Sequence, residues 1–124
     1  METQATVGLS AHGHDSLRRL KEDGYFAEML DAYRFAISLG IAHDMKASGT
    51  GSRSTIFNVG SLDPDKTIYN TIRALANDSG ESVYGLAEQY AEWGVAEMSK
   101  EAANGTLSLA ALIQEAAEKY EQKS

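Results

Sequence analysis

The chain has 124 residues, with 11 basic and 18 acidic side chains and a formal net charge of −7. It has no cysteine, which excludes a disulfide scaffold, a thiolate metal site and a cysteine nucleophile. Its apolar runs fall short of the roughly 20 residues that a membrane-spanning helix needs, and its N-terminus shows no signal-peptide pattern. We therefore expect a cytoplasmic protein that forms a single domain over residues 1–124.

The acidic charge is concentrated in the C-terminal third. Residues 1–80 carry eight basic and ten acidic side chains, a net −2, whereas residues 81–124 carry three and eight, a net −5. Binding to a phosphate backbone relies on lysine and arginine. The balance therefore disfavours nucleic acid as the partner, and it makes the C-terminal helices a docking surface for a basic protein.

The first 45 residues predict a strand followed by two helices. Residues 5–10 alternate apolar and small polar side chains, which is typical of a short strand. A helix is expected over 14–23, capped by Asp15 or Ser16 and stopped by Gly24 in a left-handed conformation. The next helix, over 25–42, is apolar on two sides and so needs cover on both. We therefore predict a homodimer through this module, with a core formed by Val7, Leu9, Phe26, Leu30, Tyr33 and Ile37.

The rest of the chain predicts a connector and three helices. Residues 46–62 hold a glycine- and serine-rich loop over 46–54 and a short strand over 55–59. Residues 63–124 form the helical part: one helix from Pro64 to about 77 with Asp63 as its N-cap, one over 83–102 capped by Ser82, and one over 108–121. The fold class is mainly α, with about five helices and one or two short strands. The side chains expected to point inward are Val83, Leu86, Tyr90, Trp93 and Met98, then Leu109, Leu112, Ile113, Ala116 and Tyr120.

No set of residues forms a convincing catalytic site. His12, His14 and His43 resemble parts of a metal site, but a catalytic metal needs about three ligands and an open position, and a capping turn explains the first pair. The loop over 49–54 lacks the lysine of a phosphate-binding loop. The glutamates at 81, 88, 92, 97 and 101 fit a solvated helix face. We therefore predict a non-enzymatic protein without a cofactor or a metal.

One glycine lies in the middle of a predicted helix. Gly94 costs that helix about 1 kcal/mol relative to alanine. Its presence indicates either a close approach of a neighbouring chain segment or a tolerated glycine, and Gly40 and Gly85 have the same two interpretations.

The order strand, helix, helix in residues 1–45 resembles a ribbon-helix-helix module. This resemblance implies that two chains pair their strands into a ribbon that enters the major groove of DNA. It makes a DNA-binding transcriptional regulator the alternative function. The nucleic-acid contacts would then be Gln4, Thr6, Arg18, Arg19, Lys21, Lys46 and Arg53.

A longer resemblance covers most of the chain. Residues 20–26 (LKEDGYF), 35–40 (FAISLG), 56–58 (IFN), 72–76 (IRALA) and 88–94 (EQYAEWG) resemble segments of the small accessory proteins encoded with Dnd DNA-phosphorothioation systems. The resemblance implies a prokaryotic or phage protein linked to DNA modification and anti-phage defence, with no defined catalytic residues. Our leading hypothesis is therefore a non-enzymatic adaptor that acts through protein contacts, ahead of the DNA-binding regulator. A metal-dependent hydrolase using the three histidines is the third hypothesis.

Overall fold

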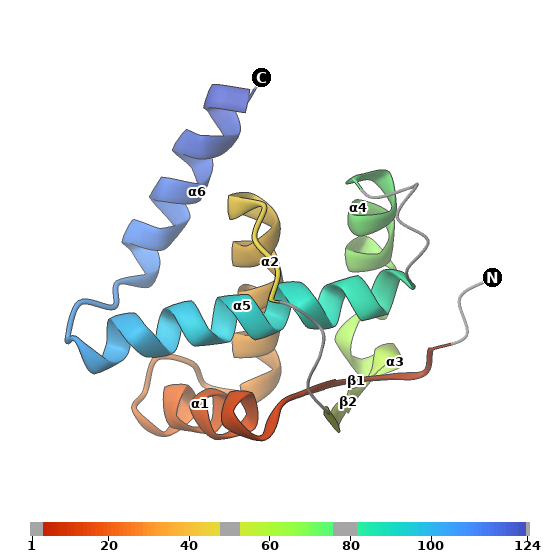
Figure 1. Cartoon of the computed structure of the whole chain (residues 1–124), viewed down its shortest axis with the longest axis horizontal. Coiled ribbons are helices and arrows are strands. Elements are labelled where there is room, and N and C mark those ends of the chain that lie inside the picture. The colour runs from red at the N-terminus through yellow and green to blue at the C-terminus, as the bar shows by residue number, and fades with distance from the viewer. Residues whose placement is uncertain (1–3, 48–52, 76–81, 124) are drawn as a thin grey trace.

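The structure is a computed structural model that describes residues 4–47, 53–75 and 82–123. These residues form six helices and one two-stranded antiparallel sheet, which confirms the mainly α fold with short strands. Figure 1 shows α5 along the length of the molecule, with α2 crossing it and α6 projecting from one end. The elements are β1 (Thr6–Leu9), α1 (Ala11–Glu22), α2 (Met29–His43), β2 (Ser54–Asn58), α3 (Val59–Leu62), α4 (Thr67–Leu75), α5 (Val83–Ala103) and α6 (Leu109–Lys123).

Two glycines bring α2 and α5 into close contact where they cross. A Cβ atom on Gly94 of α5 would lie 2.2 Å from the carbonyl oxygen of Ala36 on α2. A Cβ on Gly40 of α2 would lie 2.8 Å from the carbonyl oxygen of Tyr90 on α5. The close-approach interpretation is therefore confirmed at both positions. Gly85 differs, because a Cβ there would meet the Ser82 side chain that caps α5.

The first two helices begin at positions other than those predicted. α1 starts at Ala11, because the Ser10 side chain accepts a hydrogen bond from the Gly13 N–H at 3.0 Å and so caps the helix early. Gly24 follows α1 with φ +87°, which confirms the left-handed stop. α2 starts four residues later than predicted, because Glu28 is its extended N-cap and residues 25–28 are not helical.

The predicted helix from Pro64 corresponds to α4 alone, and α3 ends before Asp63, in a stretch where no helix was predicted. The Asp63 carboxylate does act as a cap, but for α4, which begins at Thr67. It accepts hydrogen bonds from the N–H groups of Ile68 and Tyr69, at 2.9 Å each, and from the hydroxyl of Tyr84 at 2.8 Å. This buried carboxylate, 3% exposed, ties α4 to α5. Residues 76–77, the predicted end of the helix, lie outside the described residues.

β1 pairs with β2 of the same chain, so the structure does not show the shared ribbon that the ribbon-helix-helix resemblance predicts. The antiparallel register joins Val7 to Phe57 and, after an irregularity, Gly8 to Thr55. A Cβ on Gly8 would lie 2.1 Å from the carbonyl oxygen of Ser54, so the close pairing requires a glycine. One edge of β1 is therefore already occupied within the chain.

The other edge of β1 is bound by two carboxylates of α5. The Gly8 N–H donates to Glu88 Oε2 at 2.8 Å, and the Ser10 N–H donates to Glu92 Oε1 at 2.9 Å. The Ser10 hydroxyl donates to the second oxygen of Glu92 at 2.8 Å. The prediction that Glu88 and Glu92 belong to a solvated face is therefore wrong, because they satisfy the backbone donors of a strand edge.

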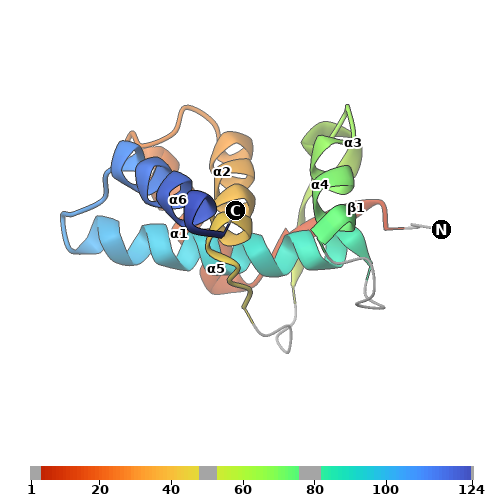
Figure 2. The ribbon, with the colours of Figure 1, turned by 90° about the horizontal axis from the view of Figure 1, so that it is seen from above.

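The predicted dimer core is the chain's own core. Val7, Leu9, Tyr33 and Ile37 are each at most 1% exposed in the single chain, and Phe26 and Leu30 pack against this core partly buried. The apolar faces of α2 are covered by α1, α5 and α6, as the two views in Figures 1 and 2 show. A second subunit is therefore not needed to explain why α2 is apolar on two sides.

The buried Tyr33 makes alkaline stability a test of this packing. Its hydroxyl donates to the Gly8 carbonyl at 3.0 Å, and burial, followed by the charge of Glu88, raises its pKa. Above about pH 10 tyrosine ionises in the unfolded chain while Tyr33 stays neutral in the folded one, so the free energy of unfolding falls as the pH rises. We expect Tyr33→Phe to lose about 1 kcal/mol near neutral pH through the missing hydrogen bond and to show a shallower alkaline fall. Urea unfolding at a series of pH values from neutral to alkaline measures both effects. If the free energy of unfolding falls equally steeply with pH in Tyr33→Phe and in the wild-type protein, the prediction is refuted.

Candidate protein-docking site

The turn between α5 and α6 folds α6 back over the end of α5. Gly105 takes φ +72°, and the Thr106 N–H donates to the Glu101 carbonyl at 2.9 Å. The Thr106 hydroxyl donates to the Glu101 carboxylate at 2.5 Å, which holds that side chain beside the turn. Ser108 then caps α6, because its side chain accepts the Ala111 N–H at 3.2 Å.

This turn borders a cavity of about 180 Å³, open to solvent on one side, between α5, α6 and the end of α2. One wall is aromatic: the rings of His43 and Trp93 lie 5.7 Å apart at an angle of 43°. The floor includes Leu112, which is 8% exposed and anchors α6 to the core. The lining consists of His43, Trp93, Glu97, Glu101, Thr106, Ser108, Ala111, Leu112 and Glu115.

The cavity is lined by an excess of acidic side chains. Three carboxylates line it, those of Glu97, Glu101 and Glu115, and its described lining includes no lysine or arginine. Lys100, which lies outside the lining, pairs with Glu97 at 3.2 Å, so Glu101 and Glu115 contribute most of the excess negative charge. Carboxylates beside an indole face attract a cationic group through charge and through the π-system. The chemistry of this cavity therefore fits a lysine or arginine side chain.

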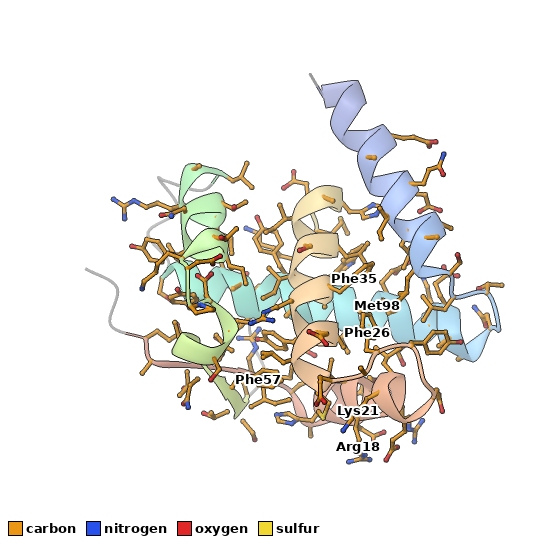
Figure 3. All side chains as sticks on the ribbon, turned by 180° about the vertical axis from the view of Figure 1, so that it is seen from behind. Arg18, Lys21, Phe26, Phe35, Phe57 and Met98 are labelled. Atoms are coloured by element: carbon orange, nitrogen blue, oxygen red, sulfur yellow. The ribbon has the colours of Figure 1, made fainter. Side chains whose placement is uncertain are left out.

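The predicted nucleic-acid residues do not form one surface. Arg18, Arg19 and Lys21 share the exposed face of α1, and Figure 3 shows Arg18 and Lys21 on the outside of the molecule. Both arginines also contact Asp15, which reduces the positive charge of this face.

The other four predicted contacts have partners within the chain. Arg53 is 19% exposed and lies 3.9 Å from Glu92. The Lys46 ammonium lies 5.8 Å from the centre of the Tyr90 ring. The remaining two are Gln4, which accepts a hydrogen bond from Ser82, and Thr6, whose hydroxyl lies 3.4 Å from that of Thr55.

The three histidines do not come together. His12 is exposed, the Nε2 atom of His14 lies 3.0 Å from the Ser54 carbonyl oxygen, and His43 lines the cavity. Within residues 4–47, 53–75 and 82–123, no three histidine, aspartate or glutamate side chains are placed to hold a metal ion. The predicted connector residues 48–52 lie outside the part of the chain that the structure describes.

Comparisons with known proteins identify no relative: no protein-family model, curated protein or solved structure matches this chain. In the described part of the chain, none of the helices combines the length and the apolar character that crossing a membrane requires.

The acidic helices are predictable from the sequence, but the cavity is not. Trp93 has the spacing of a core residue, yet it is half-buried in the cavity wall. Ile113 was predicted to point inward but is 58% exposed, because the neighbouring Leu112 is the residue of α6 that packs into the core. The signal for the site was the run of glutamates on two consecutive helices around a single tryptophan. The side chains of Ala116 and Tyr120 lie outside the described residues.

Proposed function

We propose that this protein is a non-enzymatic adaptor that binds a basic segment of a partner protein at the cavity between α5 and α6. The proposal rests on one observation, that three carboxylates and an indole line the same cavity. The net charge of −5 over residues 81–124 draws a basic partner toward it.

The resemblance to accessory proteins of Dnd systems supplies the proposed setting. Such a setting is a prokaryotic or phage complex for DNA modification or defence. Proteins that handle DNA present lysine- and arginine-rich surfaces. An acidic adaptor is complementary to a protein of that kind, so we take the partner to be a DNA-handling member of the complex.

The alternative, a DNA-binding regulator, has one supporting observation. The exposed basic face of α1, with Arg18, Arg19 and Lys21, could contact phosphates. The ribbon that would read the bases is the weak point, because β1 pairs with β2 of its own chain. The overall charge of −7 also opposes DNA binding.

The adaptor proposal is tested with Trp93, the single tryptophan of the chain and a part of the cavity wall. Its fluorescence is followed while an arginine-rich peptide is added. We expect a saturable change, and about tenfold weaker binding for Glu101→Gln/Glu115→Gln, since each lost charge removes part of a close attraction. The matched control is Asp23→Asn/Glu28→Gln, which removes the same charge from exposed positions between α1 and α2. Equal weakening by both pairs would show non-specific attraction and contradict the proposal.

The alternative has its own test, a titration of fluorescent duplex DNA at low and at physiological salt. If the protein is an adaptor, no binding is expected even at low salt. Binding that falls steeply with salt and disappears in Arg18→Ala/Arg19→Ala would favour the regulator.

A further inference from the structure

A second depression lies on the other flank of α6. It is a groove of about 220 Å³ between α2 and α6, and its described lining carries no charge. Figure 3 shows Phe35 between these two helices, with Phe26 below it, and the two rings lie 5.6 Å apart. The lining consists of Phe35, Ser38, Leu39, Ala42, Leu112 and Ile113.

The groove leaves apolar surface uncovered. Leu112 fills the space between α6 and the core, but Ile113 beside it is 58% exposed at the rim of the groove. The outer half of α6 extends past the end of α2 in Figure 1. An open apolar groove between two helices is the kind of site that accepts the apolar face of a third helix.

Negative charge lies at one end of this groove. Ala42 lines the groove and the next residue, His43, lines the acidic cavity, so the two depressions meet at the last turn of α2. The C-terminal end of a helix favours cations because it is the negative end of the helix dipole. Asp44, the exposed C-cap of α2, adds a carboxylate at the same point. An occupant of the groove therefore meets apolar walls along its length and an acidic end.

We propose that the groove between α2 and α6 binds a basic amphipathic helix of the partner protein. Its apolar side chains, spaced at i, i+3 or i+4 and i+7, lie against Phe35, Leu39 and Ile113. Its lysine or arginine side chains reach Asp44 and the acidic cavity. A second copy of this chain fits less well, because each copy carries −7 and brings its own acidic C-terminal third to the contact. This inference rests on the proposed function and specifies the form of the partner.

The test compares two peptides of identical composition, labelled for fluorescence anisotropy. One places its leucines on one face of a basic helix, and the other has the same residues scrambled so that no apolar face forms. The amphipathic peptide is expected to bind about tenfold more tightly, because only it can bury a leucine side chain in the groove. The proposal is supported if the amphipathic peptide binds more tightly and if Ile113→Gln weakens its binding severalfold.

Matched variants separate the groove from the rest of the surface. Leu75→Gln on α4 makes the same chemical change at a side chain that is 61% exposed, and it is expected to leave affinity unchanged. Ser38→Lys, at an exposed position in the groove lining, adds a charge of the partner's own sign and is expected to weaken binding. Both groove positions are exposed, so these variants are expected to fold, which circular dichroism checks.

Three results would overturn the proposal, each in a distinguishable way. Equal affinity for the two peptides would agree with an acidic adaptor but contradict the binding of an amphipathic helix in the groove. Failure of both peptides to bind would overturn the proposed function together with this inference. If light scattering shows that the protein alone is a dimer, and Ile113→Gln makes it a monomer, then the groove binds a second copy of this chain instead.

Discussion

Replacing Gly94 by alanine is expected to destabilise the protein by about 3 kcal/mol, a large part of the stability of a small domain. The new Cβ would lie 2.2 Å from the Ala36 carbonyl oxygen and 2.7 Å from its carbonyl carbon and Cα. These are backbone atoms, so α2 itself must move away from α5. The better helix propensity of alanine returns only about 1 kcal/mol.

Thermal unfolding measures this effect, with an expected drop in Tm of roughly 10 °C. Gly60→Ala is the matched control, because a Cβ at Gly60 would meet no heavy atom within 4 Å. We expect this control to melt close to the wild-type protein. If Gly94→Ala melts there as well, α2 and α5 do not cross at Gly94 as described.

Replacing Asp63 by alanine is expected to cost about 3 kcal/mol as well. The carboxylate is 3% exposed and accepts three hydrogen bonds, two from the first turn of α4 and one from Tyr84 on α5. Losing the helix cap costs about 1 kcal/mol, and losing a buried hydrogen bond to a charged group costs about 2 kcal/mol.

The control for this prediction is Asp65→Ala, two residues further along the same connection. Asp65 is exposed and accepts a hydrogen bond from the Thr67 N–H at 3.1 Å. Water can replace this hydrogen bond when the side chain is removed. Urea unfolding of the two variants is expected to show a much larger loss for Asp63→Ala. Equal losses would mean that Asp63 does not join α4 to α5.

The local features of the fold could be predicted because their causes are local. Ser82 caps α5 through a hydrogen bond from the Gly85 N–H at 2.9 Å, and Gly24 ends the segment of α1. Each depends on residues within one helical turn. The steps of three and four between apolar residues likewise predicted the helices, and they placed Tyr33 and Ile37 correctly as core residues.

The non-local features could not be predicted from these patterns. The alternation in residues 5–10 indicates a strand but not its partner, which lies near residue 55 of the same chain. The spacing of Glu88 and Glu92 fits a solvated helix face equally well, and only the position of β1 makes them acceptors for its N–H groups. A resemblance based on the order of elements therefore predicted pairing between two chains where the structure has pairing within one.

The candidate site was predictable in its charge but not in its shape. The excess of glutamates over residues 81–124 is visible in the sequence. Their convergence on Trp93 depends on the turn at Gly105 and on the choice of Leu112 rather than Ile113 as the anchor of α6. Both residues fit an inward position by spacing, and the direction of α6 decides between them.

Locating the bound peptide by NMR tests directly whether the cavity between α5 and α6 binds a basic partner. The amphipathic basic peptide is added to ¹⁵N-labelled protein, and the single indole N–H signal of Trp93 is followed with the backbone signals. If the cavity binds the peptide, the signals of Trp93, His43, Thr106 and Ser108 are expected to shift saturably while those of Arg18 remain in place. An unmoved Trp93 signal in the presence of excess peptide would contradict the claim that this cavity binds a basic partner.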